Sequence, residues 1–159
     1  MQGFSLHYYT RLRSLSPNHS ATDCGETEWF HMLSESLKID DVISQTSALM
    51  DKYDPEKRIG LIVDEWGNWH DVKPGTNPGF LFQQNTLRDA LVAAATLDIF
   101  NKHADRVKMT NIAQMVNVLQ AMILTKDEQM VLTPSYYVYQ MYKVHHDATL
   151  LPLYLQTED

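Results

Sequence analysis

The stretch Arg58-Ile59-Gly60-Leu61-Ile62-Val63-Asp64-Glu65-Trp66 decides the fold class of this chain. It contains a continuous run of branched apolar residues, which is typical of a parallel strand that is buried on both faces. The run ends in two carboxylates, Asp64 and Glu65, and an aromatic residue, Trp66. In parallel α/β folds the carboxyl ends of the strands carry the active site, because the loops that follow them gather there. The stretch therefore predicts a buried strand with polar chemistry at its end.

Strands and helices alternate on both sides of this stretch. The sequence predicts strands at 4–9, 58–66, 105–112, 130–132 and 150–155, and helices at 27–53, from Thr86 to Phe100 and from Pro134 onward. Asp40 or Asp41 is the expected cap of a second helix inside 27–53, and Thr86 with Asp89 forms a capping-box pattern. This order indicates parallel α/β architecture. A closed eight-stranded barrel takes about 250 residues, so a chain of 159 residues is too short for one.

Glu65 is the first candidate for chemistry. Because side chains alternate along a strand, we expect Leu61, Val63 and Glu65 on one face of the sheet. Ile62 and Asp64 are expected on the other face. A carboxylate placed where a buried strand emerges is suited to catalysis over a pocket. The alternative is that the two carboxylates only cap the strand by binding amides of the loop.

Other side chains are expected beside that carboxylate. Ser5, His7 and Tyr9 share a face of the first predicted strand, and the last two lie at its end. A tyrosine hydroxyl within hydrogen-bond reach could hold a nucleophilic carboxylate ionised and oriented. The alternative is a buried aromatic residue with a satisfied hydroxyl. Trp66 and Trp69 offer aromatic faces, which are good platforms for sugar rings.

The composition excludes several classes of function. The net charge is −7, which argues against nucleic acid as a partner, and the hydrophobic fraction of 44% allows a packed core. No apolar run approaches the roughly 20 residues of a membrane span. The opening residues lack the basic and apolar regions of a signal peptide, and the single cysteine, Cys24, suits a reducing compartment, so a cytoplasmic location is expected. No metal-ligand spacing and no phosphate-binding glycine loop occurs, so no metal or cofactor is expected.

Five segments resemble blocks of one known family and follow its order. They are Ser5–Tyr9, Ile62–Trp69, Asn101–Lys108, Ile112–Val118 and Tyr142–His145. They resemble the retaining α-L-arabinofuranosidases of glycoside hydrolase family 51: respectively the sixth barrel strand, the nucleophile strand, the last barrel strand, the loop after it, and the final barrel helix. The second segment carries the Asp-Glu-Trp core and the second tryptophan of the nucleophile strand. The resemblance covers nearly the whole chain.

The resemblance implies an exo-acting enzyme. Such an enzyme releases terminal α-L-arabinofuranosyl groups, with retention, from arabinose-containing oligo- and polysaccharides. Two carboxyl groups about 5 Å apart act in sequence, one attacking the anomeric carbon and the other protonating the leaving oxygen. Glu65 matches the nucleophile. The positions that match substrate-binding residues are His7, Tyr9, Trp69 and Gln114, with Trp66 as a weaker candidate for the pocket wall.

The sequence also departs from the family pattern. The acid/base glutamate of the family lies in an Asn-Glu-Pro context, which does not occur here. The resemblance therefore implies that residues 1–147 are strands six to eight of a (β/α)8 TIM barrel with their helices, and that 148–159 begin a C-terminal β-sandwich. Such a piece has open sheet edges, so we expect it to be inactive alone, poorly stable and prone to associate. The intact enzyme is expected to be a homo-oligomer.

Two other interpretations stay open at this point. One is a different retaining carbohydrase on the same barrel, of the xylosidase or endoglucanase type, in which Glu65 keeps its role and the sugar changes. The other is a small α/β domain that binds a ligand without chemistry. That second interpretation predicts a compact, monomeric unit that folds cooperatively.

Overall fold

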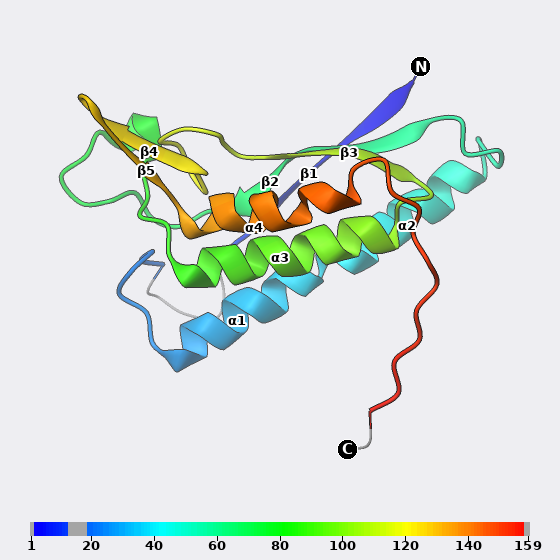
Figure 1. Ribbon diagram of the computed structural model, residues 1–159, viewed down its shortest axis with the longest axis horizontal. Helices are drawn as coiled ribbons and strands as arrows, with labels where there is room; N and C mark the ends of the chain where they lie inside the picture. Colours follow the sequence, from blue (N-terminus) through cyan, green and yellow to red (C-terminus); the bar gives the residue numbers. More distant parts are fainter. Residues whose placement is uncertain (1, 13–18, 158–159) are drawn as a thin grey trace.

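The computed structural model describes residues 2–12 and 19–157, and in it the chain forms an α/β fold. Three strands make a parallel sheet in the order β1-β2-β3, with the bounds Gly3–Thr10, Gly60–Asn68 and Val107–Ile112. The α-helices are α1 (Glu26–Leu37), α2 (Ile39–Asp51), α3 (Leu87–Lys102) and α4 (Pro134–Tyr142). They cover one face of the sheet and leave the other face open (Figure 1). The predicted alternation of parallel strands and helices is confirmed.

The helix starts follow local sequence signals, with one exception. Thr86 caps α3, and its N–H donates to Asp89 Oδ2 at 2.7 Å, as the capping-box pattern predicts. Pro134 occupies the first turn of α4, as predicted. The prediction that Asp40 or Asp41 caps the second helix is wrong, because α2 begins at Ile39 and its N-cap is Lys38. Both carboxylates lie in its first turn, where negative charge favours the helix dipole.

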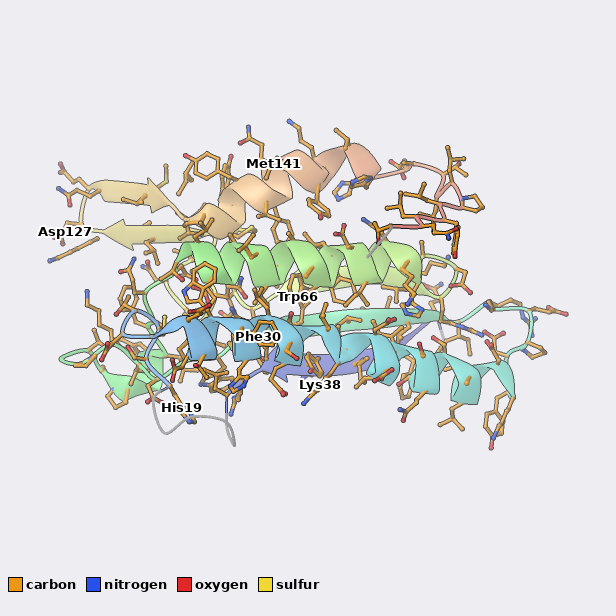
Figure 2. All side chains as sticks on the ribbon, turned by 90° about the horizontal axis from the view of Figure 1, so that it is seen from below. His19, Phe30, Lys38, Trp66, Asp127 and Met141 are labelled. Carbon is orange, nitrogen blue, oxygen red and sulfur yellow. The ribbon has the colours of Figure 1, made fainter. Side chains whose placement is uncertain are left out.

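The core lies between the sheet and the helices. Its buried residues come from α2, β2, α3, β3 and α4, namely Ile39, Ile43, Leu61, Val63, Trp66, Ala90, Ala93, Ile99, Phe100, Val107 and Val138. Seen from the helix side, Trp66 lies behind the helical layer (Figure 2). Among the described helices, none is both long and apolar enough to cross a bilayer.

Gly67 lets the end of β2 approach the loop that follows β3. Its φ of +143° lies in a region that favours glycine, and a Cβ there would meet Gln120 Oε1 at 3.3 Å and the Ala113 carbonyl oxygen at 3.4 Å. The next residue, Asn68, donates its N–H to Gln120 Oε1 at 2.8 Å. The loop after β3 is thereby fixed at the carboxyl end of β2.

A second, two-stranded sheet stands at this same end of the parallel sheet (Figure 1). It is an antiparallel hairpin of β4 (Ile123–Lys126) and β5 (Gln129–Leu132). The strand predicted at 130–132 therefore exists, but it pairs with β4 and does not extend the parallel sheet. Short 3₁₀ turns occur at Pro78–Phe80 and Lys143–His145.

The strand predicted at 150–155 is not formed. Its residues have no regular secondary structure, and Leu151 and Tyr154 are 76% and 85% exposed. An apolar, β-favouring sequence becomes a strand only when another strand satisfies its backbone, and no described strand lies beside it. The prediction was therefore wrong for this chain.

Candidate functional site

A β-bulge in β2 decides which way its carboxylates point. Between two paired positions of β1, Ser5 and His7, the partner positions in β2 advance three residues, from Ile62 to Glu65. On the other side of β2, the register with β3 shows the same extra residue between Val63 and Trp66. A bulge of this kind breaks the alternation of side chains at the inserted residue. Here the inserted residue lies next to the two carboxylates.

The bulge corrects the predicted faces. Leu61, Val63 and Trp66 lie on the helix-covered face and are 0%, 0% and 1% exposed. Asp64 and Glu65 both extend from the opposite, open face, where they contact side chains of β1. The expectation that Glu65 shares the face of Leu61 and Val63 was wrong, because simple alternation does not hold through a bulge.

Three side chains of β1 bind these carboxylates. Ser5 Oγ donates a hydrogen bond to Asp64 Oδ1 at 2.8 Å. His7 lies between the two acids, with Nε2 at 3.3 Å from Asp64 Oδ1 and Nδ1 at 3.0 Å from Glu65 Oε2. The Tyr9 hydroxyl donates to Glu65 Oε1. The expected shared face of Ser5, His7 and Tyr9 is therefore confirmed, and we call these five residues the carboxylate cluster.

The electrostatics of the cluster favour an ionised Asp64 and a protonated Tyr9. The hydrogen bond from Ser5 holds the pKa of Asp64 below its ordinary value against the opposing effect of burial, and His7 lowers it further. Burial raises the pKa of Tyr9 well above its ordinary value, and the bond to Glu65 raises it more. Tyr9 is therefore a hydrogen-bond donor at all ordinary pH values.

Trp69 forms an aromatic wall beside the cluster. Its ring meets Tyr9 edge to face at a centroid distance of 4.9 Å. The guanidinium carbon of Arg11 lies 3.7 Å from the Trp69 ring centroid, a cation–π arrangement. The backbone N–H of Trp69 donates to the Thr10 carbonyl at 3.1 Å, which ties the residue to the end of β1. This arrangement can present an apolar ring face next to Glu65.

Two other expected site residues lie apart from the cluster. Trp66 packs in the core against Phe100 and Tyr139, with ring centroids 5.2 Å and 6.4 Å away. Its expected place in the pocket wall was therefore wrong, because the bulge returns it to the helix side. Gln114 follows β3 at the same end of the sheet and is exposed, and among the described residues its side chain makes no hydrogen bond to the cluster.

Known proteins are similar to this chain in sequence and in fold. Residues 64–159, more than half of the chain, match the family model described as the α-L-arabinofuranosidase C-terminal domain. The chain belongs to the α-L-arabinofuranosidases of glycoside hydrolase family 51.

Individual relatives agree with this membership. The chain is 54% identical over 158 residues to the intracellular exo-α-L-arabinofuranosidase of Bacteroides ovatus, covering 99% of this chain and 31% of the relative. The crystal structure of the GH51 arabinofuranosidase from Xanthomonas axonopodis pv. citri matches with 58% identity and a TM-score of 0.95, covering 99% of this chain and 32% of that one. An α-L-arabinofuranosidase structure from Thermotoga maritima, in an arabinose complex, has 22% identity and a TM-score of 0.69 over 89% of this chain and 26% of that one, which indicates the shared fold. The chain thus spans about a third of the length of these relatives.

The matched family model begins inside β2, whereas the resemblance implies a domain boundary at residue 148. The core cluster contains Ile39 and Leu61, which precede residue 64, and Trp66 and Phe100, which follow it. Residues on both sides of the start of the family model therefore pack in one core.

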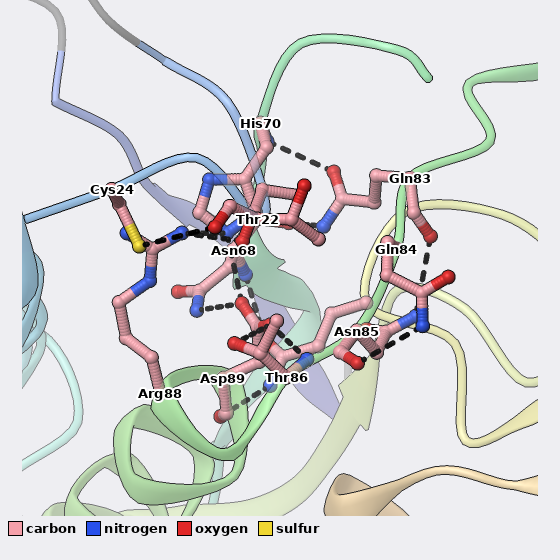
Figure 3. A network of polar contacts seen from close by, with 12 residues as sticks. Thr22, Cys24, Asn68, His70, Gln83, Gln84, Asn85, Thr86, Arg88 and Asp89 are labelled. Carbon is pink, nitrogen blue, oxygen red and sulfur yellow. Dashed lines mark hydrogen bonds and ion pairs between the residues drawn. The ribbon is translucent and has the colours of Figure 1, made fainter. Parts of the chain in front are cut away.

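In this arabinofuranosidase-family chain a buried polar network joins the end of β2, the loop that follows it and α3 (Figure 3). Asp89 Oδ1 accepts hydrogen bonds from Asn68 Nδ2 at 2.7 Å and from His70 Nε2 at 2.8 Å. Gln83 accepts from the His70 N–H at 2.9 Å and donates to the Asn68 carbonyl at 3.1 Å. The network holds the residues on both sides of Trp69, so it fixes the aromatic wall on the sheet.

This network was not predicted from the sequence, which indicates an ordinary loop histidine at His70 and only a helix cap at Asp89. Both side chains are in fact buried, at 1% and 0% exposure. Burial alone would raise the pKa of Asp89, but its contacts with His70, Asn68 and Thr86 hold it below the ordinary value. In the described residues, no group of three histidine, cysteine or acidic side chains is placed to hold a metal ion.

Proposed function

We propose that the full-length enzyme that carries this chain is a retaining glycoside hydrolase. It releases terminal non-reducing α-L-arabinofuranosyl groups from arabinose-containing oligo- and polysaccharides. One observation carries this proposal: Glu65 leaves the end of the central parallel strand on the open face and is bound by Tyr9 and His7. The identity of the sugar is inferred from membership of the arabinofuranosidase family and from the names of the relatives.

In the proposed mechanism Glu65 is the nucleophile. Its ionised carboxylate attacks the anomeric carbon to give a covalent glycosyl-enzyme, which water then hydrolyses. Tyr9 and His7 hold the carboxylate in place for attack by binding one oxygen each. Trp69 lines the sugar pocket, and Gln114 contacts a hydroxyl of the sugar. Trp66 does not line the pocket, and it packs in the core beneath the strand.

The second carboxyl group of a retaining enzyme is expected about 5 Å from the nucleophile. The family carries it in an Asn-Glu-Pro context, which the 159 residues do not contain. We therefore propose that the acid/base lies outside these residues, and that the 159-residue chain alone is inactive.

We propose further that β1, β2 and β3 are strands six to eight of a (β/α)8 barrel. Their parallel order, the helices on one face only and the reactive side chains at the carboxyl ends support this assignment. The outer edges of β1 and β3 have no partner in the described residues, as expected where further barrel strands join. A cavity of about 580 Å³ beside β3, lined in part by Met109, Tyr139 and Lys143, gives room for a neighbouring element. In this assignment residues 1–147 belong to the barrel and 148–159 begin the β-sandwich.

Two properties of the whole protein belong to the same proposal. We place the enzyme in the cytoplasm, supported by the name of the Bacteroides ovatus relative, which is called intracellular. We also expect the intact enzyme to be a homo-oligomer, as the resemblance to the family implies. The direct check is the mass of the purified full-length protein in solution.

The experiment that tests the proposed function is substitution of the nucleophile. Glu65→Ala in the full-length enzyme should lower kcat on 4-nitrophenyl α-L-arabinofuranoside by several orders of magnitude. Azide should restore turnover, because a small external nucleophile can fill the space of the missing carboxylate. A folded Glu65→Ala enzyme that keeps its rate would remove the nucleophile assignment. Activity on aryl xylosides but not on the arabinofuranoside would instead identify another carbohydrase on the same barrel.

A further inference from the structure

His7 occupies an unusual position between two carboxylates. Its Nε2 lies 3.3 Å from Asp64 Oδ1 and its Nδ1 lies 3.0 Å from Glu65 Oε2. A neutral imidazole carries a proton on only one ring nitrogen, so one lone pair would then face a carboxylate oxygen. A ring with both nitrogens protonated donates to both acids. The geometry therefore suits a positively charged ring that bridges two negative groups.

Asp64 is held in place for this contact by a second donor. Ser5 Oγ binds the same oxygen, Asp64 Oδ1, that faces His7 Nε2. The hydroxyl of Ser5 also keeps Asp64 ionised, since it lowers the pKa of that carboxyl. The bulge in β2 makes the arrangement possible, because without it Asp64 and Glu65 would point to opposite faces.

The surroundings of His7 contain few other charges. The Tyr9 hydroxyl donates to Glu65. The Arg11 guanidinium lies over the rings of Tyr9 and Trp69. From β3, the residues in register with this part of β2 are uncharged, from Met109 to Ile112. Among the described residues, Asp64 and Glu65 are therefore the charged groups that contact the ring directly.

We propose that Asp64 is a positioning residue that acts through His7. It holds the ring as an imidazolium whose Nδ1–H points at Glu65, and Ser5 holds Asp64 in turn. The result is a nucleophile that stays ionised and oriented while its like-charged neighbour is neutralised by the same ring. This inference rests on the proposed role of Glu65 as the nucleophile.

The test compares Asp64→Asn with a matched control in the full-length enzyme. Asp64→Asn keeps the shape of the side chain and removes its charge. The expected result is a roughly 10- to 100-fold fall in kcat with little change in KM, which is the usual size of effect for a group that orients a functional histidine. Asp64→Glu, which restores the charge, should recover part of the rate. The control is Asp41→Asn, an exposed acid on α2, which should leave kcat unchanged.

A spectroscopic measurement separates positioning from simple loss of structure. In enzyme labelled with ¹⁵N-histidine, with His7→Gln used for assignment, both ring nitrogens of His7 should appear protonated at pH 7. In Asp64→Asn one of them should lose its proton. Ser5→Ala should show the same change to a smaller degree, with a several-fold loss of rate, and it carries the test if Asp64→Asn does not fold.

Each outcome decides between the claims. A normal rate in Asp64→Asn, or a loss of rate with the His7 signals unchanged, overturns the positioning role and leaves the proposed function intact if Glu65→Ala is inactive. A fully active Glu65→Ala enzyme overturns both claims. A fall in kcat together with the changed His7 signals supports the positioning role.

Discussion

The two ends of the parallel sheet each carry two carboxylates that share one nitrogen-bearing side chain, but that side chain is buried at the amino end and exposed at the carboxyl end. At the amino end, Arg106 is 1% exposed and donates to Asp54 Oδ2 at 2.9 Å and to the Ile59 carbonyl at 3.0 Å, while also binding Asp51. The Ile59 N–H adds a bond to Asp54 at 2.7 Å and holds the pKa of that acid low. The burial of Arg106 and its pairing with both acids make this a structural network that closes the turn before β2.

At the carboxyl end, the acids are only partly covered, and the His7 side chain between them is 53% exposed. The side chains of Asp64 and Glu65 are 40% and 38% exposed, and their partners are His7, Tyr9 and Ser5. Acids on an open face are accessible to a substrate, as an attacking carboxylate must be. The comparison teaches that the exposure of the bridging side chain, rather than the presence of acids, separates the proposed reactive end from the structural end.

The largest expected effect is on stability at the amino end. Arg106→Met leaves Asp54 buried without its cation, and breaking a buried ion pair in this way is strongly destabilising. We expect the melting temperature of the full-length enzyme to fall by roughly 5–10 °C, with kcat of the folded enzyme unchanged. Calorimetry and initial rates at low temperature check this. A loss of kcat with an unchanged melting temperature would contradict the assigned roles of the two ends.

The next effect is on activity at the carboxyl end. Tyr9→Phe removes the donor to Glu65 Oε1, and loss of one preorganised donor costs roughly 100-fold in kcat. Tyr8→Phe is the matched control, because the neighbouring hydroxyl donates to the Glu35 carbonyl of α1 at 2.8 Å, on the helix side. The control should keep its kcat and lose only about 1 kcal/mol of stability. Equal losses of rate in the two variants would show that β1 does not divide its faces in this way.

A third prediction concerns the pH dependence of stability through Asp89. Its pKa lies below the ordinary value of 3.8 in the folded state, so its ionised form stabilises the fold. That contribution is complete above about pH 4 and is lost as the pH falls from 3.8 toward the folded pKa. Asp89→Asn should lower the free energy of unfolding by about 2 kcal/mol at pH 7 and flatten the loss of stability below pH 4. Acid unfolding followed by circular dichroism measures both, and an unchanged acid slope would contradict the role of Asp89.

The smallest effect is on sugar binding. Trp69→Ala removes the ring that meets Tyr9 and Arg11, and we expect a roughly ten-fold rise in KM with a smaller change in kcat. Trp69→Phe, which keeps an aromatic face, should restore most of the binding. If both variants bind substrate normally, Trp69 is not part of the pocket.

The strand β2 and the position of two carboxylates at its end were predictable from the sequence, but the direction of its side chains was not. A long run of branched apolar residues before Asp64 and Glu65 is typical of a parallel strand that is buried on both faces. The bulge depends on pairing with β1 and β3. Leu61, Val63 and Trp66 are all buried on one face, although strict alternation would put Trp66 on the opposite face from the other two. An apolar residue at this out-of-phase position was the local sign of a bulge.

The remaining errors share a physical cause, which is dependence on distant partners. The network around Asp89 joins residues from the end of β2, the following loop and α3, and no local pattern connects them. The stretch at 150–155 has the composition of a strand, but strand formation requires a neighbour that the described chain does not provide. The contact of Tyr9 with Glu65, between neighbouring strands, was expected, whereas the contacts that join loops and helices were not predicted.

The most direct test of the central claim is to locate the covalent intermediate. The full-length enzyme would be treated with a slow arabinofuranosyl substrate that traps the glycosyl-enzyme, digested, and analysed by mass spectrometry of its peptides. The account predicts one arabinofuranosyl adduct, on Glu65, and none in Glu65→Ala. An adduct on another carboxylate, or turnover with no covalent adduct and with inversion at the anomeric carbon, would contradict it.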